Sequence, residues 1–279
     1  MAKKNDAVYR RSIFTFLDIL GFREAVKEKP VADLHRILAV LREAAKPDNW
    51  SARTYEMSFM TFSDCTIRAV PVESKANRKN PDGILWYELN DLLHVQYRML
   101  CQGFLLRGSV TIGDICVDGS TVFGPAMVRG YSLESEIAVY PRIIVDPIVI
   151  ETFKNDDLLV FCPTGLDVKI NRRIDRSHIR KLVRRDSDGL YFIDYLRAIL
   201  SEFDDEDGYI DFLAYHKRLI LTHSAAQKPI SKISAKLLWV AAYHNSVIRE
   251  IGKRRFAKRG LNIKDFLISA AEFPLLVTL

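Results

Sequence analysis

Two aspartates are the residues of this sequence best suited to hold metal ions. Asp18 lies in the apolar segment FLDILGF at 16–22, where a buried strand is expected to pass through a glycine turn into a helix. Asp64 lies in FMTFSDCTIRAV at 59–70, whose two apolar runs predict a β-hairpin. Taken singly, either aspartate could instead cap a helix or a turn. As a pair, they predict a two-cation site for phosphoryl transfer.

The turn after the first strand offers backbone groups to the same site. The carbonyl oxygen of Ile19 is a candidate for a further metal ligand. The amides of Leu20, Gly21 and Phe22 lie where a helix begins, and amides at that position can bind phosphate oxygens. Glycine at the middle position allows the phosphates to approach the backbone closely.

Hydrophobic periodicity predicts the elements that must position these groups. The order is strand, helices, hairpin, helix, strand, helix and strand, followed by helices near the C-terminus. This order is typical of a mixed α/β (α+β) fold, here a ferredoxin-like layer with antiparallel strands and helices on one face. The clearest elements are a strand at 12–19, helices at 31–45 and 84–102, a hairpin at 57–70, and helices at 209–225 and 231–251.

Composition narrows the class of protein without naming a partner. The 279 residues are 48% hydrophobic, which is enough for a sizeable core, and the formal net charge is +6. That charge suits a polyphosphate ligand, a nucleic acid or neither. The four cysteines lack metal-binding spacing, and no apolar stretch is long enough to span a membrane. We expect a cytoplasmic protein with neither a membrane nor a nucleic acid as partner.

The order of these motifs resembles the catalytic domain of class III nucleotide cyclases, the adenylyl and guanylyl cyclase superfamily. FLDILGF is similar to the family's first metal strand and phosphate loop, and FSDCTIRAV at 62–70 to the hairpin with the second metal carboxylate. The segments LLRGSVTIGDI at 105–115, VFGPAMVRGYSLESE at 122–136 and YPRIIVDP at 140–147 resemble the central strand, the helix with transition-state groups and the closing strand. The stand-alone pyrimidine cyclases of the bacterial Pycsar anti-phage systems look most alike.

This resemblance implies an architecture and a reaction. Residues 1–165 would form the catalytic core, and residues 166–279 a mainly helical extension packed on the core or on a partner subunit. The enzyme would be a homodimer that binds two Mg²⁺ or Mn²⁺ ions per site and cyclises a nucleoside triphosphate. Its product would act as a second messenger on a separate effector protein during phage infection.

Departures from the family pattern bear on the substrate. Purine cyclases place a polar base-reading residue four positions before the second metal carboxylate, where this sequence has Met60. Thr121 stands at the second base-reading position. Because a thioether cannot hydrogen-bond a purine edge as those residues do, we expect a pyrimidine substrate, UTP first and CTP second. Trp50 and Tyr55 are candidates for stacking on the base, although such aromatic residues also occur in cores.

Two arginines are candidates for the cation that stabilises the transition state. The family's asparagine and arginine align with Val128 and Ser132, so Arg129, one position along, is the first candidate. It would come from the partner subunit. Arg107 on the central strand is the alternative, with a structural salt bridge to Asp114 or Glu134 as its competing role. A rival of another class is an inactive module that binds a nucleotide or a nucleic acid.

Overall fold

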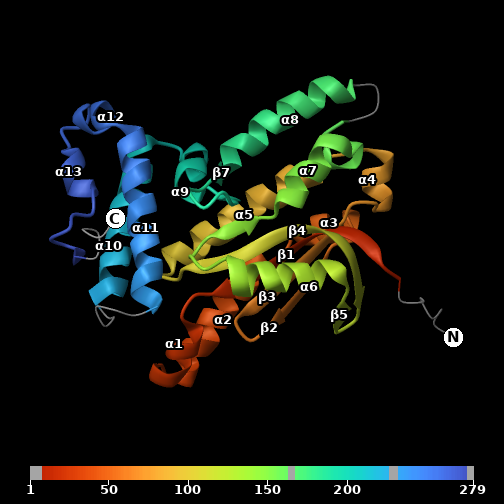
Figure 1. Cartoon of the computed structure of the whole chain (residues 1–279), viewed down its shortest axis with the longest axis horizontal. Helices are drawn as coiled ribbons and strands as arrows, with labels where there is room; N and C mark the ends of the chain where they lie inside the picture. Colours follow the sequence, from red (N-terminus) through yellow and green to blue (C-terminus); the bar gives the residue numbers. More distant parts are fainter. Residues whose placement is uncertain (1–7, 163–166, 226–231, 275–279) are drawn as a thin grey trace. The chain divides into compact units, whose positions relative to one another are not determined.

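The computed structural model describes residues 8–162, 167–225 and 232–274. The chain forms two compact units, residues 1–194 and 195–279, which are described separately (Figure 1). The mixed α/β class expected from the sequence is confirmed, with a largely antiparallel sheet in the first unit and helices in the second.

The first unit is built on an eight-stranded sheet. Its strand order is β2-β3-β1-β4-β6-β8-β7, with β5 paired to the end of β4. The pairs are antiparallel except for β4 with β6. The strands are β1 (Arg10–Ile19), β2 (Ser58–Phe62), β3 (Cys65–Pro71), β4 (Leu106–Asp118), β5 (Thr121–Phe123), β6 (Ile143–Val145), β7 (Val183–Arg185) and β8 (Tyr191–Ile193).

Strand β1 is central because it is apolar on both faces. Residues 12–19 are all buried, as expected for a strand covered on each side. The side chains alternate between the faces. Phe14 and Phe16 pack in one cluster with Ala126 of helix α6 (Pro125–Ser132). Thr15 faces the other way, where its hydroxyl donates to Glu88 of helix α5 at 2.7 Å.

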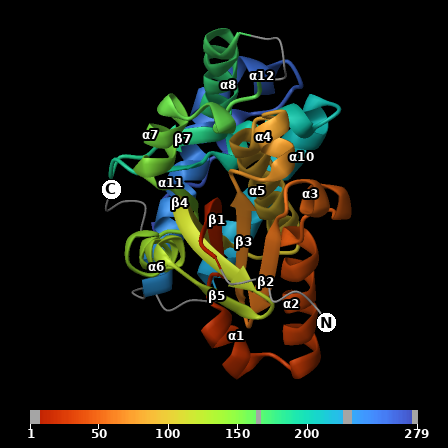
Figure 2. The ribbon, with the colours of Figure 1, turned by 90° about the vertical axis from the view of Figure 1, so that its right-hand side faces the viewer.

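Helices therefore cover both faces of the sheet, and the expectation of helices on one face was wrong. Figure 2 shows α6 on one side of the strands and α2 on the other. Helix α6 comes close to β1 because residue 130 is glycine: a Cβ there would lie 2.6 Å from the Phe14 ring. The remaining helices up to residue 155 are α1 (Phe22–Glu28), α2 (Val31–Ala45), α3 (Asn49–Thr54), α4 (Lys75–Lys79), α5 (Ile84–Cys101) and α7 (Pro147–Asn155).

The first unit extends beyond the boundary at 165 that the sequence suggested. Helix α8 (Val168–Leu182) packs on α5, and the strands β7 and β8 continue the sheet next to β6. Backbone hydrogen bonds of a sheet tie these residues to the core, so the division falls between Asp194 and Tyr195.

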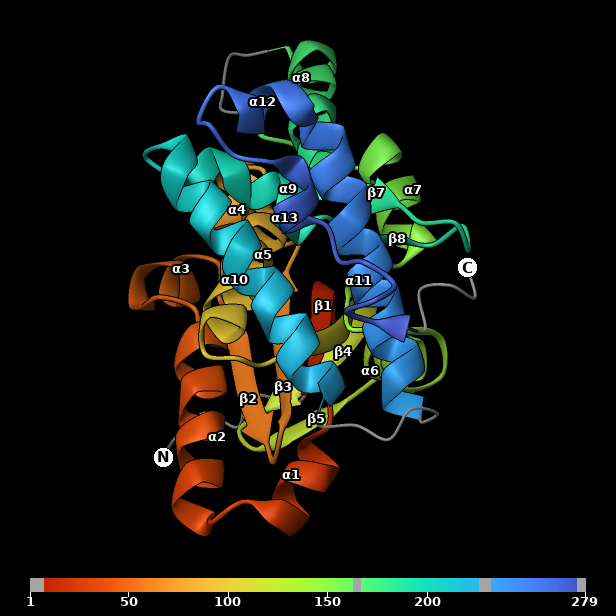
Figure 3. The same cartoon turned by 90° about the vertical axis from the view of Figure 1, so that its left-hand side faces the viewer.

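The second unit is helical. Its two long helices, α10 (Glu206–Ala225) and α11 (Lys232–Ile251), lie side by side (Figure 3) and close to the ranges expected from periodicity. Shorter helices complete it: α9 (Tyr195–Ala198), α12 (Lys253–Ala257) and α13 (Ile263–Phe266). Whether this unit packs on the core or on a partner subunit stays a prediction. No helix in the described part of the chain is long and apolar enough to cross a membrane.

Candidate metal and nucleotide site

Strand register brings three polar side chains into one row. Asp18 of β1 is the cross-strand neighbour of Cys65 on β3 and of Arg107 on β4. Directly opposite residues in a sheet point to the same face, so these three side chains are adjacent although they are far apart in sequence. The row lies on the α6 face of the sheet. Asp18 is two residues after Phe16 on β1 and so points to the same face, where Phe16 packs with Ala126 of α6.

A tight turn delivers the second carboxylate to this row. Phe62 pairs with Cys65, which leaves Ser63 and Asp64 as the whole connection between β2 and β3. Ser63 has φ of 53°, a left-handed conformation that costs a non-glycine residue about 1 kcal/mol or more. The strained turn holds Asp64 at the end of the hairpin, beside Asp18.

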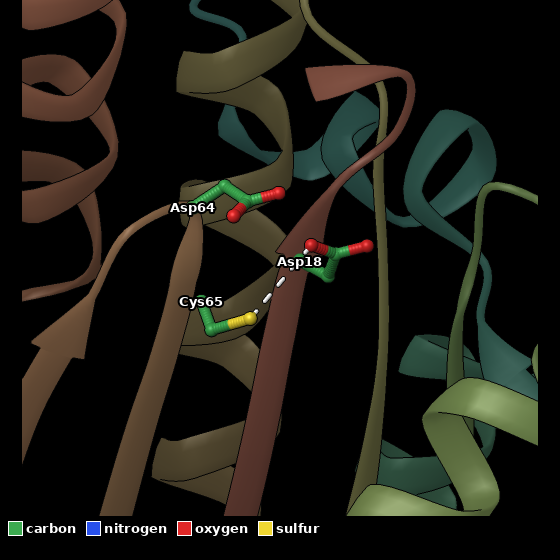
Figure 4. Close-up of side chains that lie close together, drawn as sticks. All are labelled: Asp18, Asp64 and Cys65. Carbon is green, nitrogen blue, oxygen red and sulfur yellow. Dashed lines mark hydrogen bonds between the residues drawn. The ribbon is translucent and has the colours of Figure 1, made fainter. Parts of the chain in front are cut away.

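The two carboxylates and one thiol form a compact cluster. One ligand atom from each of Asp18, Asp64 and Cys65 lies within 4.8 Å of the other two. Figure 4 shows the three side chains converging from β1 and from the hairpin, with the Cys65 thiol directed at Asp18 Oδ1 at 3.9 Å. A cation between the aspartates would contact oxygens from both.

Burial and like charges make Asp18 a poor place for an uncompensated charge. The residue is 9% exposed. Burial raises the pKa of its carboxyl to about 7, the hydrogen bond from Arg107 opposes the rise, and the nearby Glu134 and Asp64 add to it. Arg107 Nε lies 2.9 Å from Asp18 Oδ2 and 2.6 Å from Glu134 Oε1, so one guanidinium serves two carboxylates.

The donor set fits a hard divalent cation. Carboxylate oxygens are the usual protein ligands of Mg²⁺ and Mn²⁺. Burial and the surrounding carboxylates raise the pKa of the Cys65 thiol to about 12, and a soft sulfur ligand does not suit these hard cations. The two aspartates are therefore the groups that would hold such an ion, and Cys65 would only flank it.

The expected phosphate loop lies next to this cluster, but one of its backbone amides already donates to another backbone group. The Leu20 amide donates to the Leu105 carbonyl at 2.9 Å, so the expectation that it points at phosphate does not hold in this conformation. Gly21 has φ of 81°, and a Cβ there would meet no atom within 4 Å, so the backbone is open to a ligand. Phe22 begins α1 with a buried side chain, and Ile19 pairs with Leu106.

The two candidate arginines occupy different positions. Arg107 contacts Asp18 directly, as described. Arg129 of α6 instead makes a two-point contact with Asp146, with distances of 2.8 and 3.2 Å from its Nε and Nη2. Burial alone would raise the pKa of Asp146, but hydrogen bonds from Arg129 and Thr111 hold it below its usual value. Within one chain the structure brings Arg107, not Arg129, into contact with Asp18.

The residues expected to form a base pocket are not brought together in one chain. Met60 lies on the same face as Asp18, because its cross-strand neighbour is Ile67, two residues from Cys65. Thr121 begins β5, which pairs with the far end of β4. That position lies roughly 35 Å along the strand from Arg107, too far for both to touch one nucleotide.

Trp50 and Tyr55 lie on the opposite face of the sheet. Their rings meet edge to face at 6.0 Å and line a cavity of about 270 Å³ together with Arg68 and Glu88. Arg68 alternates with Ile67 along β3, so this cavity is on the α5 side. The expectation that these aromatic residues stack on the base was wrong for a single chain, because α3 and the residue after it line the cavity on the Arg68 face, opposite Asp18.

Glu134 is the residue of the cluster that the sequence did not single out as a member. It is 3% exposed and lies in a π-helical turn, Leu133–Ile137, that continues α6. Such turns often occur at functional sites because they redirect side chains. The sequence had named Glu134 only as a possible ion-pair partner of Arg107. The structure confirms that contact and adds that the same arginine reaches Asp18.

Comparisons with known proteins give structural likeness alone. No model of a known protein family matches the chain, and no curated protein matches its sequence. Among solved structures, the chain is similar to the guanylyl cyclase Cya2, with 14% identity, a TM-score of 0.39, and coverage of 58% of this chain and 89% of that one. The chain is also similar to the catalytic core of a rhodopsin-guanylyl cyclase with converted specificity, in complex with ATPalphaS. The identity is 16%, the TM-score is 0.40, and the match covers 66% of this chain and 95% of that one.

An adenylate/guanylate cyclase/hydrolase from Silicibacter pomeroyi is also similar, with 17% identity, a TM-score of 0.37, and coverage of 58% of this chain and 94% of that one. At these identities and TM-scores, the matches assign no role to any residue of this chain.

Proposed function

We propose that this protein is a nucleotide cyclase that converts UTP to 3′,5′-cyclic UMP and pyrophosphate with two divalent cations, Mg²⁺ or Mn²⁺. The observation that carries the proposal is the approach of Asp18 and Asp64 to within 4.8 Å in a cluster where Asp18 is buried and Asp64 is half-buried. Two carboxylates so close repel each other unless a proton or a cation lies between them. A cation site explains why the fold maintains this arrangement.

The chain's own residues would divide the work of the reaction. Asp18, Asp64 and the Ile19 carbonyl would hold the cations. When bound, the cations lower the pKa of the attacking 3′-hydroxyl and neutralise the phosphates. The backbone at Gly21 and Phe22 would orient the phosphates. Arg107, already at the aspartates, is the alternative to Arg129 as the group that stabilises charge on the α-phosphate.

A composite dimer site would reconcile the positions of the remaining candidates. Arg129 and Thr121 are remote from Asp18 within one chain, so they can contribute to its site only from a second subunit. The α6 surface carries exposed apolar side chains, with Val128 68% and Tyr131 56% exposed. Burying such side chains favours association. In this proposal each site takes its metal ligands from one subunit and Arg129 from the other.

The preference for a pyrimidine rests on Met60. Its side chain lies on the face of the aspartates, and it offers no strong hydrogen bond to a purine edge. CTP is the second choice because nothing at Met60 or Thr121 separates a uracil from a cytosine. The product would be a second messenger in anti-phage defence that activates a separate effector.

Incubation with nucleotides tests the reaction. The protein is given ATP, GTP, CTP or UTP with Mn²⁺ or Mg²⁺, and cyclic monophosphates and pyrophosphate are identified by chromatography and mass spectrometry. We expect one cyclic pyrimidine product and a loss of at least about 100-fold in Asp64→Asn, because a bridging ligand is removed. The exposed Asp118→Asn on β4 is the matched control. A cyclic purine would overturn the substrate assignment. Absence of any product would favour the inactive binding module.

Mixing two inactive variants tests the composite site. If Asp18→Asn and Arg129→Ala damage opposite halves of each site, half of the randomly mixed dimers carry one intact site of two. We therefore expect about a quarter of the wild-type activity to return on mixing. Full activity of Arg129→Ala alone would instead assign the cation to Arg107. No recovery from two folded, inactive dimers would overturn the composite site.

A further inference from the structure

The excess of positive charge in the first unit is concentrated in one short segment. Residues 168–185, which comprise α8 and β7, contain eight lysines and arginines and one aspartate, a net charge of +7. The whole chain has a net charge of +6, so all other residues together sum to −1. Within the first unit, the excess of positive charge therefore lies on α8 and β7.

Helix α8 turns its acidic and apolar residues inward. Asp175, Ile179 and Leu182 are buried on the side that packs on α5. The Asp175 carboxylate accepts a hydrogen bond from the Phe161 amide at 2.5 Å. The one acidic residue of the helix is thus buried on its inner side, and the charged residues of the outer face are all basic.

The outer face presents cations at regular intervals. Lys169, Arg173, Arg176 and Arg180 follow the spacing i, i+4, i+7 and i+11, which places them in one stripe about 16 Å long. All four are exposed. Among the residues that the structure describes, no carboxylate pairs with the first three. By contrast, Arg172 on the flank is held by Asp157 and by the Phe153 carbonyl.

We infer that α8 is a docking surface for the phosphate backbone of a nucleic acid. A row of exposed cations, one per helical turn, is complementary to a chain of regularly spaced phosphates and can displace its counterions. Membrane binding fits less well, because insertion requires a broad apolar face. Here that face is packed on α5, and only Ile170 and Ile174 are exposed beside the stripe.

This inference reverses the expectation from the sequence that nucleic acid is not a partner. Net charge alone could not decide the question, whereas its placement on one exposed helix face does. In Figure 1, α8 lies at the outer margin of the first unit, beyond α5 and α7, where a long polyanion has access. The surface is separate from the aspartate cluster, so it stands whether or not the protein is a cyclase.

Salt-dependent binding of a labelled 20-nucleotide single strand tests the surface. Wild type and the triple variant Lys169→Gln, Arg173→Gln, Arg176→Gln are titrated by fluorescence anisotropy between 50 and 300 mM salt. Each lost phosphate contact lowers the slope of log K against log salt by about 0.7, so three reduce it by about 2 and the affinity by about 100-fold at 0.1 M salt. The buried face of α8 is untouched, and circular dichroism confirms folding.

A control of equal charge separates this surface from general electrostatics. Arg36→Gln, Lys79→Gln, Lys154→Gln removes the same three charges from exposed sites on α2, α4 and α7. We expect its slope to stay near wild type. An equal loss in both triple variants, or no binding by wild type at 50 mM salt, would overturn the inference.

The membrane arm uses vesicles of phosphatidylserine and phosphatidylcholine with Ile170→Ser, Ile174→Ser. Binding to vesicles without binding to the strand, lost in this variant, would also overturn the inference. Because binding is measured without nucleoside triphosphate, its outcome is distinct from that of the cyclase assay.

Discussion

Two clusters in this chain bury titratable side chains, and they differ in how those side chains are compensated. In the first unit, Asp18 and its neighbours leave a charge imbalance that one arginine offsets only in part. In the second, His216 and His244 are fully buried, yet every ring nitrogen has a partner. Burial disfavours the charged form in both. The excess negative charge of the first cluster favours binding of a cation, whereas the second cluster has no ring nitrogen left for a ligand.

The histidine cluster is fully hydrogen-bonded because each ring donates one hydrogen bond and accepts one, so the bonds form a single directed chain. His244 Nε2 donates to the Phe266 carbonyl at 2.9 Å, since a carbonyl can only accept. Its Nδ1 then accepts from His216 Nδ1 at 3.1 Å, and His216 Nε2 accepts from the Tyr195 hydroxyl, also at 3.1 Å. Both rings are neutral in this arrangement, and they stack with centroids 5.2 Å apart. No donor or acceptor is left for another molecule.

The difference teaches that a buried cluster with excess charge is a candidate site, whereas a buried cluster that is neutral and fully hydrogen-bonded is structural. It also gives the two units opposite responses to pH. The raised pKa of Asp18 means that the folded state binds a proton more tightly than the unfolded state, so stability falls as pH rises from about 4 through about 7. The lowered pKa values of the histidines mean that stability falls as pH drops below about 6.5.

The largest expected effect is that of Asp18→Asn on stability without metal. Ionising Asp18 at pH 8 costs the folded state about 4 kcal/mol, and an amide of the same shape removes that cost. The variant should therefore be more stabilised at pH 8 than at pH 5.5, by about 2 kcal/mol. Urea unfolding in a Trp239→Phe background, which leaves Trp50 and Trp86 in the first unit, measures this difference.

The Asp118→Asn variant is again the control, because its carboxylate is exposed on β4. Added Mn²⁺ should raise the Tm of wild type and leave Asp18→Asn unchanged, since a ligand that binds only the folded state stabilises it. A stability difference independent of pH would break the comparison, because it would show that Asp18 is not protonated in the folded, metal-free protein.

The next effect is acid destabilisation of the second unit. Burial lowers the pKa of His244 to about 4, so between pH 7 and pH 4.5 the unfolded chain gains a proton that the folded unit does not. This residue alone should reduce the free energy of unfolding by about 2 kcal/mol, and His216 adds to the loss. Trp239 fluorescence in a Trp50→Phe, Trp86→Phe background follows the second unit during urea unfolding.

A double variant sharpens this test. His216→Gln, His244→Gln removes both titrating rings, so its stability should change less with pH than that of wild type over the same range. The exposed His35→Gln in the first unit is the control and should keep the wild-type slope for Trp239. An unchanged slope in the double variant would assign the acid sensitivity to other groups.

Local patterns in the sequence predicted the elements well. The helix expected at 31–45 is observed as α2 with the same bounds, and the hairpin at 57–70 corresponds to β2 and β3. Periodicity and turn residues act over a few positions, so they can be recognised without knowing what packs against them. The aspartate pair was recognisable for the same reason, since each residue ends or interrupts an apolar run.

What the sequence could not predict is which residues share a face or an end of the sheet. Trp50 and Tyr55 were candidates for stacking on the base, but α3 and the residue after it lie on the face of the sheet opposite Asp18. Thr121 was grouped with Met60, although β5 pairs with the far end of β4. Such relations depend on strand register, which is fixed by long-range pairing and not by neighbouring residues.

The sequence by itself determined which groups are available: two aspartates in or next to apolar runs, a glycine turn and an excess of positive charge. Tertiary structure alone decided their use. It set Arg107 and Glu134 beside Asp18, held Arg129 on Asp146, and aligned four exposed cations along one face of α8. The physical reason is that charge and hydrogen-bonding capacity belong to a residue, whereas distance and burial belong to the fold.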